Sequence, residues 1–181
     1  LAFDGDDSLY VVDSRNNRVQ RFTKDGRFLL SWGGSGSGDG LFNRPWGITV
    51  DQKGDVYVAD WGNERVQVLD PEGRFVMKLR GEATLSPWAE EYLNANPDEA
   101  RARSKSDLET VVNMRVESPH QESSHIEKYF WAPVSIKYAG DGVVYVVESN
   151  RHRIQVYKKE AYPLEPQDLL PEQTAPSLST V

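Results

Sequence analysis

The stretch VYVADWGNERVQVLD, from Val56 to Asp70, decides the fold because two close copies of it occur elsewhere in the chain. LYVVDSRNNRVQRFT precedes it and VYVVESNRHRIQVYK follows it. Aligning the copies places Tyr10, Tyr57 and Tyr145 in register, 47 and 88 residues apart. The second separation is close to two periods, and a period of ~40 to 45 residues is typical of four-stranded propeller blades.

Polar residues recur at fixed distances after each tyrosine. An acid stands three positions on, an arginine eight positions on, and a glutamine follows the arginine closely. The acid and the arginine flank a short connection, so we predict that they face each other across a hairpin and form structural ion pairs. These pairs are Asp13 with Arg18, Asp60 with Arg65, and Glu148 with Arg153.

Short apolar runs and turn residues alternate within one unit. PWGITVD, DVYVAD, RVQVLD and RFVMKL are separated by QKG, WGNE and PEG. This pattern predicts an all-β unit of four short antiparallel strands. The inner strands are apolar on both faces, so both faces must be covered, as they are in a radial stack of β-propeller blades.

These residues resemble a known repeat family. GSGSGDGLFNRPWGITVDQKGDVYVADWGNERVQVLDPEGRF resembles a full NHL repeat, and LYVVDSRNNRVQRFTKDGRFLLSWG and VVYVVESNRHRIQVYK resemble two more. The resemblance implies a propeller, commonly of six blades, of which about three are visible. It also implies a family that mostly binds proteins, sometimes RNA, and occasionally catalyses. PVSIKYAG departs from the Gly-Ile-x-Val-Asp pattern, and no clear fourth strand follows YKKE.

Four segments follow from this pattern. Blades 1 and 2 occupy residues 1–81, with blade 1 incomplete at its N-terminal end, and blade 3 occupies residues 132–160. A helical insertion on the propeller face spans residues 82–131, and a Pro-rich tail, extended or disordered, spans residues 161–181. An open arc would expose apolar blade faces, so we expect the remaining blades to come from the same chain, which we favour, or from another.

The insertion has no strand pattern. Ser86-Pro87 and Asn96-Pro97 are typical helix starts and predict two helices, whereas PHQESSHIE is interpreted as a polar loop. Trp88 with Tyr92, and Leu108 with Val111 and Val112, form a stripe at helical spacing that we expect to pack on its own scaffold. The crossing that carries the insertion should place it beside the blade tips.

Tip residues that differ between blades are the candidate binding residues, because residues repeated in every blade serve the blade itself. We nominate a set at the tips and at the neighbouring crossing: Arg15, Arg44, Trp46, Trp61, Asn63, Arg151 and His152.

Composition excludes several classes of function. Twenty-eight acidic against 21 basic residues give a net charge of −7, which disfavours a nucleic-acid partner, although Arg15, Arg18, Arg44, Arg65, Arg151 and Arg153 could share one face. The chain has no cysteine, and no apolar run approaches the ~20 residues of a membrane helix. The run WGGSGSGDGLFNRP resembles a phosphate loop but precedes a strand rather than a helix.

His120, Glu122 and His125 in PHQESSHIE are weak metal candidates, because their residue types suit zinc but their spacing follows no established zinc pattern. We expect no cofactor. Our hypothesis is a non-catalytic propeller module that binds a protein or peptide as part of a larger chain or assembly. The alternative is a metal-dependent propeller hydrolase or lyase.

Overall fold

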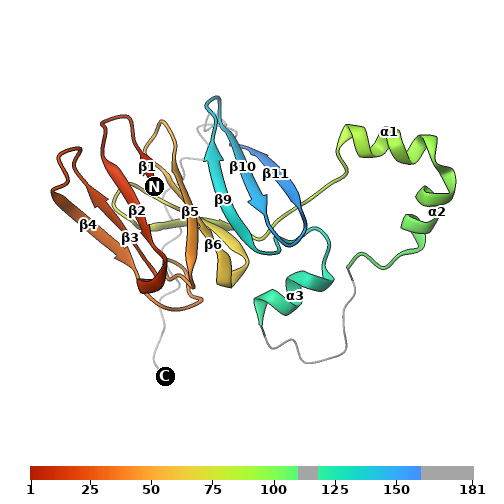
Figure 1. Ribbon diagram of the computed structural model, residues 1–181, viewed down its shortest axis with the longest axis horizontal. Helices are drawn as coiled ribbons and strands as arrows, with labels where there is room; N and C mark the ends of the chain where they lie inside the picture. Colours follow the sequence, from red (N-terminus) through yellow and green to blue (C-terminus); the bar gives the residue numbers. More distant parts are fainter. Residues whose placement is uncertain (110–117, 160–181) are drawn as a thin grey trace, which may run out of the picture.

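Three antiparallel sheets stand side by side in the computed structural model, which describes residues 1–109 and 118–159 (Figure 1). Blade 1 contains β1 (Ala2–Phe3), β2 (Leu9–Asp13), β3 (Arg18–Phe22) and β4 (Phe28–Gly33) in that order. Blade 2 contains β5 (Pro45–Val50), β6 (Val56–Asp60), β7 (Arg65–Leu69) and β8 (Phe75–Leu79). Blade 3 contains β9 (Pro133–Tyr138), β10 (Val143–Glu148) and β11 (Arg153–Lys158). Each sheet is a β-propeller blade, and blade 3 has three strands within the described residues.

Blade 2 is buried on both faces by its neighbours. Along β6, Val56 and Val58 belong to the core shared with blade 1, whereas Tyr57 and Ala59 belong to the core shared with blade 3. Successive side chains of a strand point to opposite faces, so this apolar run supplies both cores at once. The crossings add Phe42 to the first core and Phe130 to the second. This is the double coverage that the sequence predicts.

The recurrent tyrosine also fixes the turn between the first two strands of blades 1 and 2. Tyr57 donates its hydroxyl to Asp51 at 3.1 Å, and Tyr10 does the same to Asp4 at 3.1 Å. The two carboxylates also accept backbone N–H groups within their turns. Burial raises the pKa of both tyrosines to about 12. Sequence reasoning used the tyrosine only as a marker of the repeat and missed this contact.

One face of blade 3 is open. Tyr10 and Tyr57 are 0% and 5% exposed because the next blade covers them, whereas Tyr145 at the equivalent position is 39% exposed. Ile154 and Val156 on the same sheet are exposed as well. The expected apolar face at this end of the arc is therefore present in the structure.

The described part of the insertion, residues 82–109 and 118–131, contains three helices, namely α1 (Pro87–Ala95), α2 (Pro97–Lys105) and α3 (Pro119–His125). The first two begin after Ser86 and Asn96, as predicted. The interpretation of PHQESSHIE as a loop is wrong, because Ser118 caps α3 by accepting a hydrogen bond from the Gln121 N–H. The Ser-Pro pair at 118–119 repeats the start signal of α1 and was overlooked.

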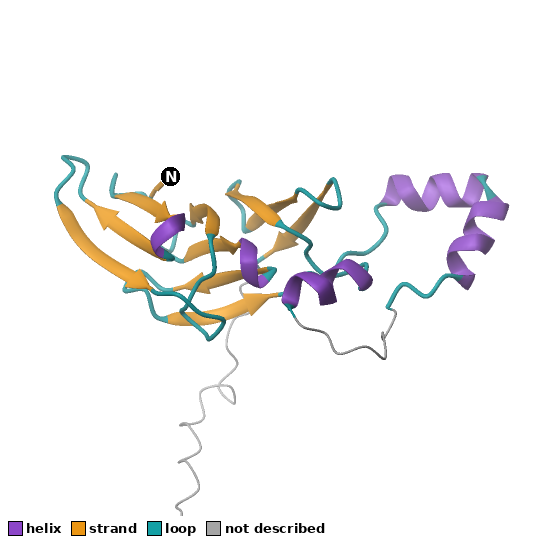
Figure 2. Ribbon diagram, turned by 60° about the horizontal axis from the view of Figure 1, so that its bottom comes forward, coloured by secondary structure: helices purple, strands orange, loops and turns teal. Residues whose placement is uncertain are grey.

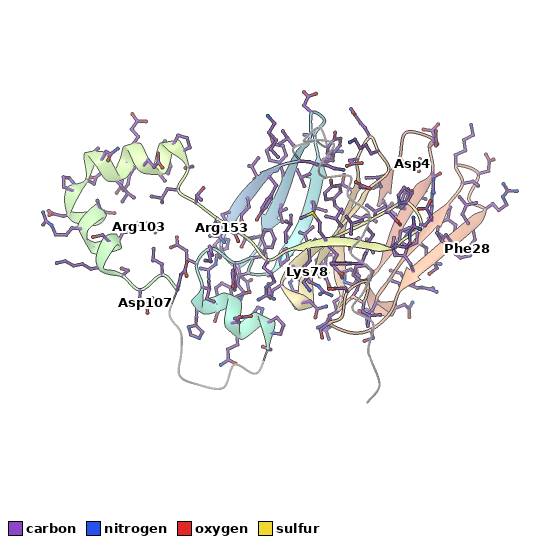
Figure 3. All side chains as sticks on the ribbon, turned by 180° about the vertical axis from the view of Figure 1, so that it is seen from behind. Asp4, Phe28, Lys78, Arg103, Asp107 and Arg153 are labelled. Carbon is purple, nitrogen blue, oxygen red and sulfur yellow. The ribbon has the colours of Figure 1, made fainter. Side chains whose placement is uncertain are left out.

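The helices lie in two places (Figures 1, 2 and 3). Helix α3 packs against η2 (Trp61–Asn63) at the tip of blade 2, whereas α1 and α2 contact each other and extend away from the sheets. Trp88 and Tyr92 stack on each other, with ring centroids 6.2 Å apart, and stay exposed. The expectation that this stripe packs on its own scaffold is therefore wrong for α1, and Val111 and Val112 lie outside the described residues. None of the described helices has the length and hydrophobicity that a membrane crossing requires.

Gly47 marks a close approach between blades 2 and 3. A Cβ atom at this position would lie 2.9 Å from the Ile136 nitrogen and 2.9 Å from the Ser135 Cα, both of which are backbone atoms. We predict that Gly47→Ala lowers the free energy of unfolding by about 1 to 3 kcal/mol, because the added methyl group forces the blades apart. Denaturant unfolding measures this change. Gly5→Ala is the matched control, because its Cβ would meet nothing within 4 Å, and an equal loss in both variants would contradict the prediction.

Candidate functional site

The repeated acid and arginine of blade 2 form a buried clamp on the crossing loop, residues 34–44, which enters from blade 1. The Asp60 carboxylate accepts hydrogen bonds from the Asn43 N–H at 2.7 Å, the Asn63 side chain at 2.8 Å and Arg65 Nε at 2.8 Å. Gln67 donates to the Leu41 carbonyl at 2.7 Å. The remaining guanidinium N–H groups of Arg65 donate to three carbonyls of the same loop, those of Ser37, Gly38 and Leu41. The clamp therefore serves architecture.

Blade 3 repeats the clamp, whereas in blade 1 the described contacts of the acid and the arginine include no crossing loop. Arg153 binds Glu148 at 2.6 Å and donates to the Tyr129 carbonyl of the crossing that precedes blade 3. In blade 1, Arg18 binds Asp13 at 2.9 Å, but the two side chains are 42% and 22% exposed. Hydrogen bonds from Asn16 and Arg18 lower the pKa of Asp13, whereas burial raises the pKa of Asp60.

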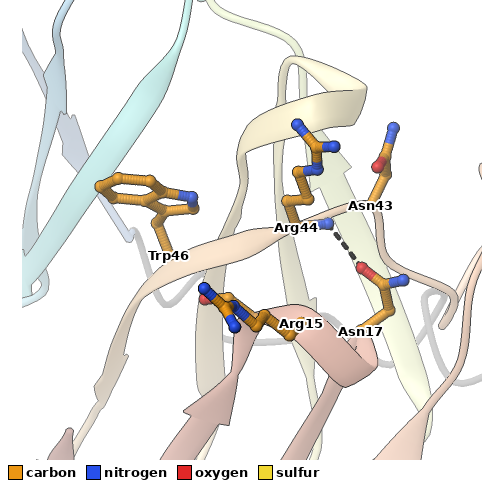
Figure 4. A pocket seen from close by; sticks show the side chains of 6 residues that line it. Arg15, Asn17, Asn43, Arg44 and Trp46 are labelled. Carbon is orange, nitrogen blue, oxygen red and sulfur yellow. Dashed lines mark hydrogen bonds between the residues drawn. The ribbon is translucent and has the colours of Figure 1, made fainter.

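A cavity of about 800 Å³ lies at the tips between blades 1 and 2, which we name junction 1/2 (Figure 4). It is lined by Ser14, Arg15, Asn17, Asn43, Arg44 and Trp46. The tip η1 (Ser14–Asn16) supplies one wall and the end of the crossing loop supplies the other. Asn17 Oδ1 accepts a hydrogen bond from the Arg44 N–H at 2.7 Å and so joins the two walls.

Four of the nominated binding residues gather here. Arg15 and Trp46 line the cavity, and Trp46 is 57% exposed. The Trp61 ring lies 6.4 Å from the Trp46 ring, and the Arg44 guanidinium lies 6.0 Å from the Trp61 ring. The cavity therefore combines cationic and aromatic groups, which suits recognition of an extended polar chain.

The structure places the other three nominated residues elsewhere. Asn63 is buried, where it donates to Asp60 and to the Gly36 carbonyl. Arg151 donates to the Ser123 and Ile126 carbonyls and so ties blade 3 to α3. His152 is exposed at the tip of blade 3. In this geometry the side chains of Asn63 and Arg151 make hydrogen bonds within the protein.

The equivalent position between blades 2 and 3, junction 2/3, is occupied by α3. His120 Nδ1 lies 2.5 Å from Glu64 Oε1, and the Trp131 indole N–H donates to His120 Nε2 at 3.1 Å. Glu64 is buried, which raises its pKa, and it also accepts a hydrogen bond from the Ala132 N–H. Sequence reasoning missed Glu64 and Trp131, although Glu64 stands in the variable column with Asn17 and His152, seven positions after each tyrosine.

The weak metal candidates are engaged in other contacts. Both ring nitrogens of His120 are hydrogen-bonded, Glu122 pairs with Arg80 at 2.7 Å, and His125 is exposed at the end of α3. Within residues 1–109 and 118–159, no group of three or more acids and histidines is arranged to hold a metal ion. The described contacts thus give the zinc hypothesis no geometric support.

Comparison with protein families identifies the repeat. Residues 42–69 and 130–157 match the family model described as NHL repeat. The chain contains NHL repeats. The copy around Tyr10 lies outside the matched segments but folds into the same four-stranded blade. Comparison with curated protein sequences gave no significant match.

One solved structure with a TM-score above 0.5 agrees on the fold. A protein of unknown function from Bacteroides thetaiotaomicron superposes with a TM-score of 0.51 at 20% identity, over 84% of this chain and 32% of that chain. A streptogramin B lyase gives a TM-score of 0.43 at 13% identity, over 86% of this chain and 38% of that one. A luciferin-regenerating enzyme gives a TM-score of 0.43 at 14% identity, over 82% of this chain and 36% of that chain. The NHL chain therefore spans about a third of the length of these structures.

The buried clamp of blade 2 yields a prediction with a built-in control. Arg65→Ala leaves the Asp60 carboxylate buried without its cation, and we expect a loss of about 3 to 5 kcal/mol in the free energy of unfolding. Arg18→Ala removes the equivalent arginine of blade 1, where the pair is partly exposed, and should cost less than about 1 kcal/mol. Denaturant unfolding of both variants measures the difference. Equal losses would show that burial does not govern the clamp.

The pKa values of Asp13 and Asp60 should also shift in opposite directions. We predict that the pKa of Asp13 lies below its ordinary value and the pKa of Asp60 above it, as measured from carboxyl carbon shifts by NMR. The stability that ionised Asp13 contributes is lost as the pH falls through its folded pKa. The Asp60 contribution has the opposite sign, because it is lost as the pH rises through its folded pKa. Coincident titration of both groups would contradict this prediction.

Proposed function

We propose that this NHL-repeat chain is a non-catalytic binding module that recognises a protein or peptide segment at junction 1/2, as part of a larger chain or assembly. The observation that carries the proposal is the cavity of about 800 Å³ at the blade tips, with two arginines and an exposed tryptophan in its wall. Exposed tryptophan and arginine side chains are enriched at protein interfaces. The open apolar face of blade 3 supports the second part, because a neighbouring blade would bury Tyr145, Ile154 and Val156.

A rigid frame favours binding at this cavity. Its two walls come from neighbouring blades, and the clamp of Asp60 and Arg65 holds the crossing loop between them. The Asn17 side chain adds a direct bond to the end of that loop. A site built on fixed elements loses little conformational entropy when it binds a flexible segment.

Selection from a displayed library of short random peptides tests the proposal. We expect peptides selected on the wild-type protein to bind Trp46→Ala at least about tenfold more weakly, since an aromatic anchor at the centre of an interface contributes more than 1 kcal/mol. Binding isotherms of the selected peptides give the ratio of the dissociation constants of Trp46→Ala and the wild type. Addition of a metal chelator should leave this ratio unchanged.

Trp88→Ala is the matched control for this experiment. Trp88 is also an exposed tryptophan, but it lies on α1, away from the cavity. We expect it to bind the selected peptides like the wild type. Selection of no peptide, or loss of binding in Trp88→Ala alone, would overturn the proposal.

A further inference from the structure

The open cavity at junction 1/2 is cationic. Arg15 and Arg44 form no ion pair with any residue in the described ranges 1–109 and 118–159, and no acid lines the cavity. Asn17 uses its side-chain oxygen on the Arg44 N–H, which leaves its amide N–H groups for a ligand. The guanidinium groups of Arg15 and Arg44 and the amide N–H groups of Asn17 are all hydrogen-bond donors. They belong to a chain whose net charge is −7.

Junction 2/3 shows how a peptide segment occupies this position. There α3 inserts His120 between Glu64 and Trp131. His120 Nε2 accepts from the indole N–H, so in the neutral ring Nδ1 carries the proton and donates it to the Glu64 carboxylate. The acidic junction is thus filled by a donor from the chain itself.

The two junctions are equivalent by their places in the repeat but opposite in charge. Asn17 corresponds to Glu64, because both are residues with positive φ at the end of a tip and both accept the N–H of the residue before the inner-strand proline. That residue is Arg44 at junction 1/2 and Ala132 at junction 2/3. Arg15 corresponds to Gly62 in the same alignment. Junction 1/2 therefore replaces one carboxylate by an amide and adds two guanidinium groups.

We propose that junction 1/2 binds an acidic peptide segment at the position that α3 occupies at junction 2/3. An aspartate or glutamate side chain is held between Arg15 and Arg44, and an apolar neighbour in the peptide lies against Trp46. This inference rests on the proposed function and specifies its ligand. Guanidinium groups bind carboxylates through paired, charge-assisted hydrogen bonds, which explains why arginine suits this cavity.

A peptide fits this charge distribution better than a nucleic acid. Of the other arginines proposed for a basic face, Arg18, Arg65 and Arg153 each pair with an acid of their own blade. Arg151 is engaged with the Ser123 and Ile126 carbonyls. Nucleic-acid affinity comes largely from contacts to many phosphates. Two arginines on a chain of net charge −7 suit a single acidic site instead.

The direct test uses three labelled peptides of one length that differ only in their charged residue. One carries alternating glutamate and phenylalanine, and glutamine or lysine replaces glutamate in the other two. We expect the glutamate peptide to bind and the other two to bind at least about tenfold more weakly, with an affinity that falls as salt rises. Arg44→Ala and Arg15→Ala should each weaken the glutamate peptide by about tenfold. Arg27→Ala, which removes an exposed arginine remote from the cavity, should leave its binding unchanged.

Asn17→Glu provides a second, independent variant. Glu64 shows that a glutamate adopts this backbone conformation and still accepts the neighbouring N–H, so we expect the variant to fold. It places a carboxylate in the wall of the cavity and should abolish binding of the glutamate peptide, while the thermal unfolding midpoint stays close to that of the wild type.

The outcomes separate this inference from the proposed function. If the random-peptide selection yields binders without acidic residues, or if the glutamine peptide binds as well as the glutamate peptide, the acidic ligand is wrong and peptide binding stands. If the selection yields no binder at all, both proposals fail. Tighter binding of a uridine oligonucleotide of matched charge, lost in Arg44→Ala, would overturn the peptide in favour of a nucleic acid.

Discussion

The buried contact between Asp60, Arg65 and the crossing loop is the constraint on which the rest of this structure depends. A crossing loop has no partner strand, so its carbonyl groups must be satisfied by other donors. Arg65 supplies them while it neutralises Asp60, and Asp60 in turn accepts the Asn43 N–H at the far end of the loop. The contact is costly to break because each partner would be left buried and unpaired. It also holds the end of the loop just before β5, which begins at Pro45 between Arg44 and Trp46.

Much of the fold could be predicted because the same pattern of residues occurs three times in the chain. The tyrosine, the acid and the arginine recur at fixed spacing, and strand periodicity assigns their faces without any knowledge of contacts. The ion pairs follow from the hairpin register, which pairs Asp60 with Arg65 directly. The helix starts at Ser86-Pro87 and Asn96-Pro97 could be read because their signals are local. A proline stands in the first turn of each helix, and Ser86 also caps α1.

The errors arose where contacts between distant segments decide the structure. Ser118-Pro119 carries the local start signal of a helix, but the polar sequence after it hid a helix that is stabilised through Glu64, 56 residues before His120. Asn63 and Arg151, both nominated as binding residues, make contacts within the scaffold for a related reason. Variation between blades identifies positions that are free of the common architecture, yet a varied residue can still be used for a contact found in one blade alone, as Arg151 is used to hold α3.

The comparison of the two junctions gives this variation a physical meaning. Both junctions keep the backbone geometry, because Arg44 and Ala132 have φ values of 51° and 60° and each precedes a proline. The side chain that accepts their N–H group is free to be an amide or a carboxylate, since either oxygen satisfies the bond. One column of the repeat can thus change the charge of a junction without changing its shape. An insertion that places α3 on the acidic junction leaves the cationic junction open, and junction 1/2 is therefore where we propose that an external segment binds.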